Sequence, residues 1–328
     1  MKPMKALQIL APGRAELIEL PVPQPGPGEV LVKVLAVTTC PQWDMHVYAG
    51  EPMWPGEPLV YPYQPGQPGH ELCGEVTALG EGVSEFAVGQ RICAWRGRSH
   101  DLPGGYAQFI VQDATDLISA PAQLEPMALA ALELAMCVSS SFLRLQELGA
   151  VAGKRFGVMG LGPAGLVAVQ LARAQGAREV VGFDLNPARR ELASALGADH
   201  VLDPGDEVVP ELPLRWQEGS LDSGIDCVGL KQSVAYLMDH TSGVVALFGV
   251  QREDYAYTGL HNGAPGLLLC GYPGHRRSAG EYALEQICAG RLSLSPLVTH
   301  CLPLAEYEQA VGLLCRQEAV KVCFDPWQ

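Results

Sequence analysis

A glycine-rich turn between two apolar runs constrains the fold of this chain most. The apolar run 155–159 is followed by Gly160, Gly162 and Gly165 and then by an apolar helical pattern. Glycines at these positions permit a tight turn, a close approach of the backbone to a ligand, and close packing of the helix on the strand. This order predicts a βαβ unit whose helix N-terminus binds the pyrophosphate of a dinucleotide.

An acidic residue follows the next apolar run. Asp184 comes directly after residues 179–183 and can accept hydrogen bonds from both hydroxyls of the dinucleotide's ribose. Its charge repels a 2′-phosphate and so favours NAD over NADP, whereas Arg189 and Arg190 act against that preference. Three later apolar runs, 225–229, 243–249 and 267–271, also end at glycines, where the chain turns near a ligand. The residues expected at the dinucleotide are Gly160, Gly162, Pro163, Ala164, Gly165, Asp184, Arg189, Cys227, Val228 and Gly249.

The pattern along the chain changes character twice. A length of 328 residues is long for one core and suggests two domains. Up to residue 116, short alternating runs broken by Gly and Pro predict an antiparallel, barrel-like domain with strands at 16–20, 29–38, 71–78 and 106–111. From 153 to about 271, strands alternate with helices, which predicts a doubly wound parallel sheet. The tail, 279–328, contains two helical patterns and a final strand, and it can return to the first domain.

Charge and cysteine use narrow the partners. The 22 basic and 36 acidic side chains give a formal charge of −14, which argues against binding to nucleic acid or to an anionic membrane. The N-terminus does not resemble a signal peptide, and no window is expected to reach membrane-spanning length. Ten cysteines without a CxxC pair are typical of reduced thiols. We therefore expect a cytoplasmic protein that acts on a small molecule.

A histidine and a carboxylate stand side by side at a strand start. His70 and Glu71 belong to the segment 68–83, which reads Pro-Gly-His-Glu-Leu-Cys-Gly and continues to Val83. Neighbours on a strand face opposite ways. One of the two side chains can therefore bind a metal in a cleft while the other supports it from behind.

This segment, the glycine turn and the stretch 297–304 together resemble the medium-chain dehydrogenase/reductase superfamily, zinc alcohol dehydrogenase type, over nearly the whole chain. The resemblance implies a GroES-like catalytic domain at 1–140 and 275–328, a Rossmann domain at 141–274, and one catalytic zinc. It implies hydride transfer between NAD(H) and an alcohol or carbonyl compound. It also implies a homodimer or homotetramer joined through the Rossmann sheet.

The resemblance assigns metal ligands residue by residue. His70 is the second ligand, and Cys40 is the first, although the family's Cys-Gly-x-Asp-x-His pattern here carries one extra residue. An ungapped match would instead put Pro41 at the ligand position. Glu133 and Cys137 both suit the third ligand, since residues four apart share one helix face, and the resemblance does not separate them.

Further roles follow from the same resemblance. Asp44 would be the carboxylate beneath the zinc, paired with Lys321, and His46 would relay protons to solvent. Glu71 would support the site. The family's four-cysteine lobe is missing, because the stretch 93–113 holds a single cysteine, so no structural zinc is expected.

The long loop before His70 bears on the substrate. The side chains expected to form an apolar, partly aromatic pocket for a medium-sized hydrophobic alcohol or aldehyde are Met53, Trp54, Tyr61, Tyr63 and Trp95. Two alternatives stay open at this point. The first is a zinc-free NAD(P)H-dependent quinone or enone reductase of the same superfamily, and the second is a non-catalytic NAD-binding regulator.

Overall fold

The computed structural model describes residues 3–54, 56, 58–205 and 212–328. The chain divides into two compact units, Met1–Leu134 with Leu294–Gln328, and Ala135–Ser293. The second boundary differs from the expected one at 275, because the helix α8 (Arg277–Cys288) belongs to the second unit. Its Tyr282 hydroxyl accepts a hydrogen bond from Gln175, which lies at the end of another helix of that unit.

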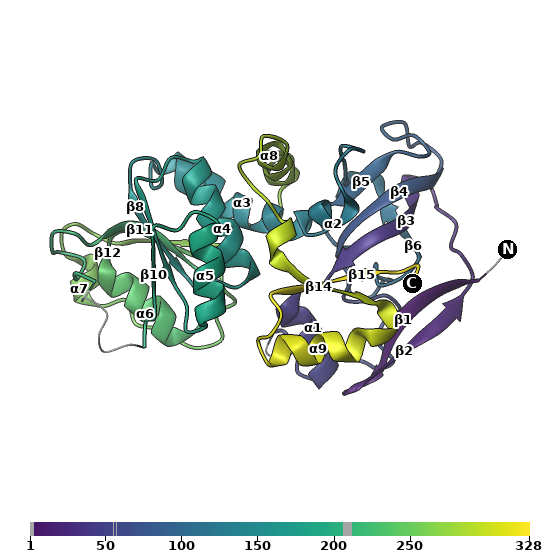
Figure 1. Ribbon diagram of the computed structural model, residues 1–328, viewed down its shortest axis with the longest axis horizontal. Coiled ribbons are helices and arrows are strands. Elements are labelled where there is room, and N and C mark those ends of the chain that lie inside the picture. The colour runs from purple at the N-terminus through teal and green to yellow at the C-terminus, as the bar shows by residue number, and fades with distance from the viewer. Residues whose placement is uncertain (1–2, 55, 57, 206–211) are drawn as a thin grey trace. The chain divides into compact units, whose positions relative to one another are not determined.

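The first unit is a mostly antiparallel sheet with a separate two-stranded ribbon. The sheet order is β14-β15-β3-β4-β5-β7, with β6 also paired to β3, and β1 pairs with β2. Its strands are β1 (Met4–Ala11), β2 (Arg14–Leu20), β3 (Glu29–Thr38), β4 (Glu71–Leu79), β5 (Arg91–Ala94), β6 (Phe109–Asp113), β7 (Leu117–Ser119), β14 (Val298–Pro303) and β15 (Lys321–Asp325). Its helices include α1 (Pro41–Ala49), α2 (Pro126–Leu129), the start of α3 (Leu132–Glu147), and α9 (Tyr307–Cys315). In Figure 1, α9 from the C-terminal part of the chain lies beside α1 from the N-terminal part.

One expected strand begins later than the sequence pattern indicates. The run 106–111 was expected to be a strand from its first residue, but β6 starts at Phe109. The reason is that Tyr106 donates its backbone N–H to the Gly66 carbonyl and accepts from the Leu7 N–H, so it joins the ribbon and the loop before His70. Tyr106 is therefore fixed in the core, where its hydroxyl serves the site described below.

The second unit is a doubly wound parallel sheet. Its order is β10-β9-β8-β11-β12-β13, and all of its neighbouring strands are parallel. The strands are β8 (Arg155–Met159), β9 (Glu179–Phe183), β10 (His200–Leu202), β11 (Leu221–Asp226), β12 (Thr241–Leu247) and β13 (Leu268–Gly271). The helices are α4 (Pro163–Ala174), α5 (Pro187–Ala195), α6 (Lys231–His240), α7 (Gly259–Asn262) and α8, together with most of α3. Figure 1 shows α4, α5 and α6 around this sheet.

The order of these strands sets where a ligand can bind. The chain runs outward from β8 to β9 and β10, then returns to the other side of β8 with β11. Ligands of such sheets bind at the carboxyl ends of the strands where the winding reverses. In this unit that point lies between β8 and β11, and the glycine turn directly follows β8.

One stretch corrects the expectation that no window reaches membrane-spanning length. Pro126–Glu147 is long and apolar enough by length and composition, and 72% of its most apolar window is buried inside the protein. Within the second unit, for example, Phe142 packs on Phe156 with ring centroids 5.5 Å apart. Its apolar side chains therefore contact the protein core, as expected for the core helix of a soluble protein.

Candidate metal and dinucleotide sites

Three potential metal ligands meet in the first unit. Cys40 is the residue before α1, His70 precedes β4, and Glu71 is the first residue of β4. The antiparallel pairing of β3 with β4 sets Thr38 opposite Glu71 and so brings the two segments together. The Cys40 sulfur, a ring nitrogen of His70 and a carboxylate oxygen of Glu71 lie within 4.8 Å of one another. Cys40 supplies the sulfur of this cluster, whereas Pro41, the first residue of α1, has no side-chain ligand atom.

Glu71 is held by a buried lysine, which corrects the expected pairing of Asp44 with Lys321. The Lys321 Nζ lies 2.7 and 2.6 Å from the two carboxylate oxygens of Glu71 and also donates to the Thr39 carbonyl. Both side chains of the pair are buried. The reason for this partner is strand register, since β15 pairs with the end of β3 and places Lys321 beside the start of β4.

Asp44 has a different set of partners. Its Oδ1 accepts from the hydroxyls of Tyr106 and Tyr307, each at 2.9 Å, and its Oδ2 accepts from the Cys40 N–H at 2.7 Å. Burial raises the pKa of the Asp44 carboxyl to about 6, although the two tyrosine hydrogen bonds act in the opposite direction. Asp44 therefore fixes the backbone of Cys40. Neither tyrosine was among the residues that the sequence singled out for the site.

The two candidates for the third ligand belong to different units. Glu133 belongs to the first unit, is largely buried, and has its Oε2 3.9 Å from His70 Nε2. Cys137 belongs to the second unit, where its sulfur lies 3.6 Å from the Nε2 of His275. No pattern in the sequence marked His275. In the first unit, Glu133 is thus the candidate next to the cluster.

The chemistry of the cluster suits a divalent cation. Burial raises the pKa of the Cys40 thiol well above its usual range, and the neighbouring carboxylates of Glu71 and Glu133 raise it further. Burial also raises the pKa of the Glu71 carboxyl, while Lys321 opposes that effect. Thiolate, imidazole and carboxylate are the ligands that zinc takes in proteins, and a cation here would offset the negative charge that these groups gather. The donor set therefore fits zinc.

His46, the expected proton relay, lies in α1. Its Nδ1 is 3.6 Å from a carboxylate oxygen of Glu51, and its side chain is mostly buried while that of Glu51 is exposed. The pair thus links α1 to the solvent-exposed residue that follows it. This is a geometry through which an imidazole can exchange protons with water.

In the second unit, the glycine turn has the form that a bound phosphate needs. Gly160 has a φ of +85°, and a Cβ on Gly165 would overlap the Gly160 carbonyl oxygen. Gly162 precedes α4 without a side-chain cap, and a Cβ on it would meet only the Arg189 guanidinium, at 4.0 Å. Pro163 and Ala164 open the helix. The N-terminus of α4 is therefore accessible to an anion, which fits the pyrophosphate of a dinucleotide.

Asp184 lies beside this turn. Its Oδ2 accepts from the Leu161 N–H at 2.7 Å and its Oδ1 from the Asn186 N–H at 2.8 Å. These bonds hold the carboxylate at the end of β9 and leave lone pairs for ribose hydroxyls. Arg189 has its Nη1 3.9 Å from Asp184 and a buried Nε without a hydrogen-bond partner among the described residues. The structure thus places this acid and this arginine together, at the position where the sequence predicts the ribose.

The remaining expected dinucleotide residues pack around the same turn. A Cβ on Gly160 would overlap the Val228 side chain, and Cys227 donates its N–H to the Met159 carbonyl at the end of β8. Gly249 contacts the backbone of Gly229. Asp226, which the sequence did not single out, accepts from the Gly229 N–H at 2.9 Å and from Gln251 Nε2 at 3.2 Å. Its carboxylate fixes the turn after β11.

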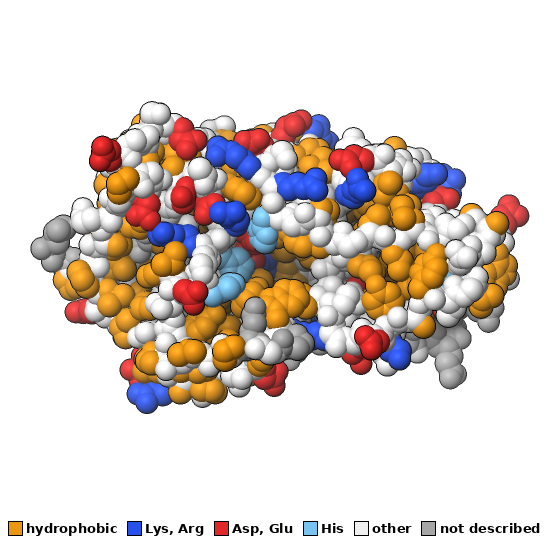
Figure 2. Space-filling view, turned by 180° about the vertical axis from the view of Figure 1, so that it is seen from behind, with side chains coloured by type: hydrophobic (Ala, Val, Ile, Leu, Met, Phe, Trp, Pro, Cys, Tyr) orange, Lys and Arg blue, Asp and Glu red, His pale blue; other side chains and the backbone are white. Residues whose placement is uncertain are grey.

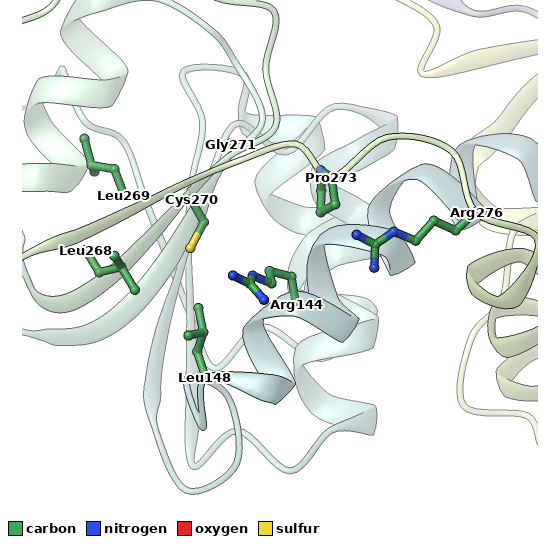
Figure 3. A pocket seen from close by; sticks show the side chains of 8 residues that line it. All are labelled: Arg144, Leu148, Leu268, Leu269, Cys270, Gly271, Pro273 and Arg276. Carbon is green, nitrogen blue, oxygen red and sulfur yellow. The ribbon is translucent and has the colours of Figure 1, made fainter.

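The second unit also contains a pocket away from these residues. It measures about 490 Å³ and is lined by Arg144, Leu148, Leu268, Leu269, Cys270, Gly271, Pro273 and Arg276 (Figure 3). Figure 3 shows the Arg144 guanidinium between the Cys270 sulfur and the Arg276 guanidinium. None of these lining residues was expected at the dinucleotide.

The expected aromatic pocket before His70 does not have the form that the sequence suggested. Met53, Tyr63 and Trp95 are buried, and Tyr63 belongs to the hydrophobic core of the first unit. The Trp95 indole donates to the Thr115 carbonyl at 2.8 Å. Trp54 alone among the five is exposed, at 43%. Most of these side chains therefore anchor the loop.

Comparison with known proteins gives a family match in each unit. Residues 26–122 match the family model "Alcohol dehydrogenase GroES-like domain", and residues 163–262 match "Zinc-binding dehydrogenase". L-threonine 3-dehydrogenase of Pyrococcus horikoshii is 29% identical over 98% of both chains. A structure described as a zinc-binding dehydrogenase of Sinorhizobium meliloti 1021, bound to NADP, is 25% identical with a TM-score of 0.85 over 99% of this chain and 100% of that one.

A further solved structure shares the fold. It is the "short chain alcohol dehydrogenase" of Escherichia coli CFT073 complexed with NADH, which is 20% identical with a TM-score of 0.85 over 99% of this chain and 100% of that one. The two family models fall on the two units, and the relatives extend over nearly the full length. The chain therefore belongs to the medium-chain dehydrogenase/reductase superfamily, zinc-containing alcohol dehydrogenase type, and is an oxidoreductase of that family.

Proposed function

We propose that this protein transfers a hydride between NAD(H) and a small-molecule alcohol or carbonyl compound at one catalytic zinc. The observation that carries the proposal is the meeting of Cys40, His70 and Glu71 within 4.8 Å in the first unit. The glycine turn and Asp184 of the second unit supply the dinucleotide site. The resemblance to zinc-type dehydrogenases gives neither the zinc-free reductase nor the non-catalytic regulator any support.

The chain's own residues would hold the two groups. Zinc supplies Lewis acidity toward an alcohol or carbonyl oxygen, and the nicotinamide accepts or gives the hydride. Cys40 and His70 would bind the metal, and Asp44 keeps Cys40 in place by accepting a hydrogen bond from its backbone N–H. His46 would exchange a proton with solvent beside Glu51. Most of the protein's contribution is thus to position the reactants.

We infer that Glu133 is the carboxylate that completes the ligand set. Glu71 already has its charge matched by Lys321, with both of its oxygens within 2.7 Å of the lysine nitrogen. A carboxylate held in this way serves best as a fixed neighbour that orients the ligands. Glu133 lies next to His70, with its Oε2 3.9 Å from the histidine Nε2. Cys137 would then remain a thiol beside His275.

We further propose NAD over NADP and the absence of a structural zinc. The Asp184 carboxylate stands at the ribose position and repels a 2′-phosphate, while Arg189 weakens this preference. The stretch between Cys93 and Asp113 contains no further cysteine. This chain therefore lacks the sulfur ligands that a second, four-cysteine zinc would need.

The substrate class follows from the relatives and from the loop. L-threonine 3-dehydrogenase is named for an amino acid that carries a secondary alcohol. We propose alcohols and ketones as the substrate class of this protein. We do not propose a preference for hydrophobic substrates, because Met53, Tyr63 and Trp95, which were expected to line the pocket, are buried. On the face in Figure 2, acidic side chains lie among basic and apolar ones rather than in one cluster.

We also propose a cytoplasmic homodimer or homotetramer joined through the Rossmann sheet.

The test is the metal content of protein purified without chelator. Wild type should hold about one zinc per chain, and Cys40→Ala should lose it. Cys73→Ala is the matched control, because Cys73 is a buried thiol on β4 outside the cluster, and it should keep the metal. Zinc-free wild type, or a Cys40→Ala variant that still holds the metal, would contradict the proposal and redirect the substrate search to quinones and enones.

A further inference from the structure

A glycine outside the ligand set lies directly against His70. A Cβ built on Gly97 would come 2.7 Å from the His70 Cβ and 3.6 Å from its Cγ. Real Cβ atoms do not approach this closely, and the His70 Cβ has little freedom because it is bonded to the backbone. Gly97 is half-buried and its φ is not in the left-handed region, so the constraint is space rather than backbone strain. The backbone of residue 97 therefore supports the root of the His70 side chain.

The loop that carries Gly97 is fixed on both sides by arginines. Arg96 forms an ion pair with Asp116 at 2.8 Å. Arg98 forms an ion pair with Glu29 at 2.8 Å and donates to the Val111 carbonyl at 2.9 Å. The glycine between them is thus held by contacts to β3, to β6 and to the residue before β7. Because ion pairs hold the loop immediately before and after residue 97, the backbone of this residue keeps a fixed position against His70.

His70 lacks the support that a metal-binding histidine usually has. Such histidines almost always donate their second ring N–H to a carboxylate or carbonyl, which fixes the orientation of the ring. Among the residues that the structure describes, the His70 ring makes no hydrogen bond, and Glu133 is 3.9 Å away. Packing against residue 97 is therefore a contact that can help to fix the side chain.

From these contacts we propose that Gly97 is a positioning residue for His70, and that the Arg96–Arg98 loop takes the place of a hydrogen-bonding partner for this ligand. The inference rests on the proposed function, in which His70 binds zinc. It adds a residue that acts on the metal through His70 without contacting the metal itself. A Cβ at position 97 requires a shift of His70 or of the loop, and we expect that shift to disturb the position of His70 in the cluster.

The experiment compares zinc affinity and the visible spectrum of the cobalt-substituted protein for wild type, Gly97→Ala and Gly243→Ala. Gly243 is the matched control, because a Cβ on it would also come within 2.7 Å of a fixed atom, the Asp222 carbonyl oxygen, in the second unit. Gly97→Ala should bind zinc about 10- to 100-fold more weakly, the range for loss of a partner that orients a ligand. Its cobalt bands should shift, and Gly243→Ala should match wild type in both measurements.

A second variant covers failure of Gly97→Ala to fold. Arg98→Met removes the ion pair to Glu29 but keeps much of the side chain's bulk, and it should weaken zinc affinity by a smaller factor in the same direction. Zinc affinity and cobalt spectra equal to wild type in Gly97→Ala would overturn this inference and leave the proposed function standing. A wild type that binds neither metal would overturn the proposed function, and this inference with it.

Discussion

The metal cluster and the dinucleotide turn are built in opposite ways. The turn is local, since Gly160, Gly165 and Asp184 lie on one βαβ segment and act through backbone and steric effects. The cluster is assembled from distant parts, and the lysine that bonds the Thr39 carbonyl lies 282 residues further along the chain. The comparison teaches that a short motif can specify a backbone shape, whereas a buried charged site depends on the pairing of whole strands.

The two sites also differ in what stabilises them. The turn is held by backbone N–H groups and by the carboxylate of Asp184. The ion pair of Asp184 with Arg189 is more exposed to solvent than the pair of Glu71 with Lys321. At the cluster, Glu71 and Lys321 are both removed from water, and Asp44 is ionisable and buried. Changes at the cluster should therefore cost more than changes at the turn.

The largest effect should come from removing a metal ligand. His70→Ala should lose zinc and reduce turnover by at least about 10³-fold, since the metal contributes several kcal/mol to charge stabilisation. NADH affinity should stay within about twofold, because the turn belongs to the other unit. Zinc analysis, NADH fluorescence titration and turnover with secondary alcohols, L-threonine among them, check this, with the exposed His200→Ala as control. Unchanged turnover would sink the zinc mechanism, and lost NADH affinity would mean that the sites are not independent.

Breaking the buried ion pair should give the next largest effect. Lys321→Met leaves the Glu71 carboxylate buried without its cation, which should lower the free energy of unfolding by about 3–5 kcal/mol. The double variant Lys321→Met with Glu71→Leu should recover much of that loss, because no unpaired charge remains. Urea unfolding of the metal-free single and double variants measures the coupling. Additive losses would show that the pair does not act as a unit.

The pH dependence of stability should also distinguish the cluster from the turn, because the cluster contains the buried Asp44. Its folded-state pKa of about 6 lies above the ordinary 3.8, so the folded protein binds this proton more tightly than the unfolded chain. The group's contribution is therefore present at low pH and is lost as pH rises from about 4 to 6, by about 3 kcal/mol in total. In the metal-free Asp44→Asn variant this part of the pH dependence should disappear. Unfolding curves of wild type and variant that stay parallel from pH 4 to 7 would refute the assignment.

The dinucleotide turn could be predicted from the sequence more completely than the metal cluster. Gly160 and Gly165 could be predicted because steric demands on a turn are local, and β3 has the bounds that its apolar pattern indicates. The partner of Lys321 could not, because it depends on the register of β15 against β3. Nor could the contact of Gly97 with His70, which joins a loop to a strand start through tertiary packing.

The predicted domain boundary differs for a related reason. The helical pattern of α8 is visible in the sequence, but its attachment to the second unit depends on side-chain contacts such as that of Tyr282 with Gln175. The choice between Glu133 and Cys137 was also open, since one helix face carries both. The approach of Glu133 to His70 within the first unit, which depends on tertiary packing, is what favours Glu133.

The smallest expected effect concerns the turn itself. Asp184→Ser removes the charge that repels a 2′-phosphate and keeps a hydroxyl for the ribose, so the ratio of NADP to NAD affinity should rise about tenfold, or about 1.4 kcal/mol. The Arg189 guanidinium, 3.9 Å from Asp184, is then free to meet the phosphate. Adding Arg189→Ala to Asp184→Ser should cancel most of the gain, while Arg190→Ala should not, because Arg190 is bound to Asp203 at 2.8 Å. A preference for NAD that survives Asp184→Ser would mean that the ribose is held elsewhere. The dinucleotide site would then depend on residues outside this one βαβ segment, and it would no longer contrast with the cluster in being local.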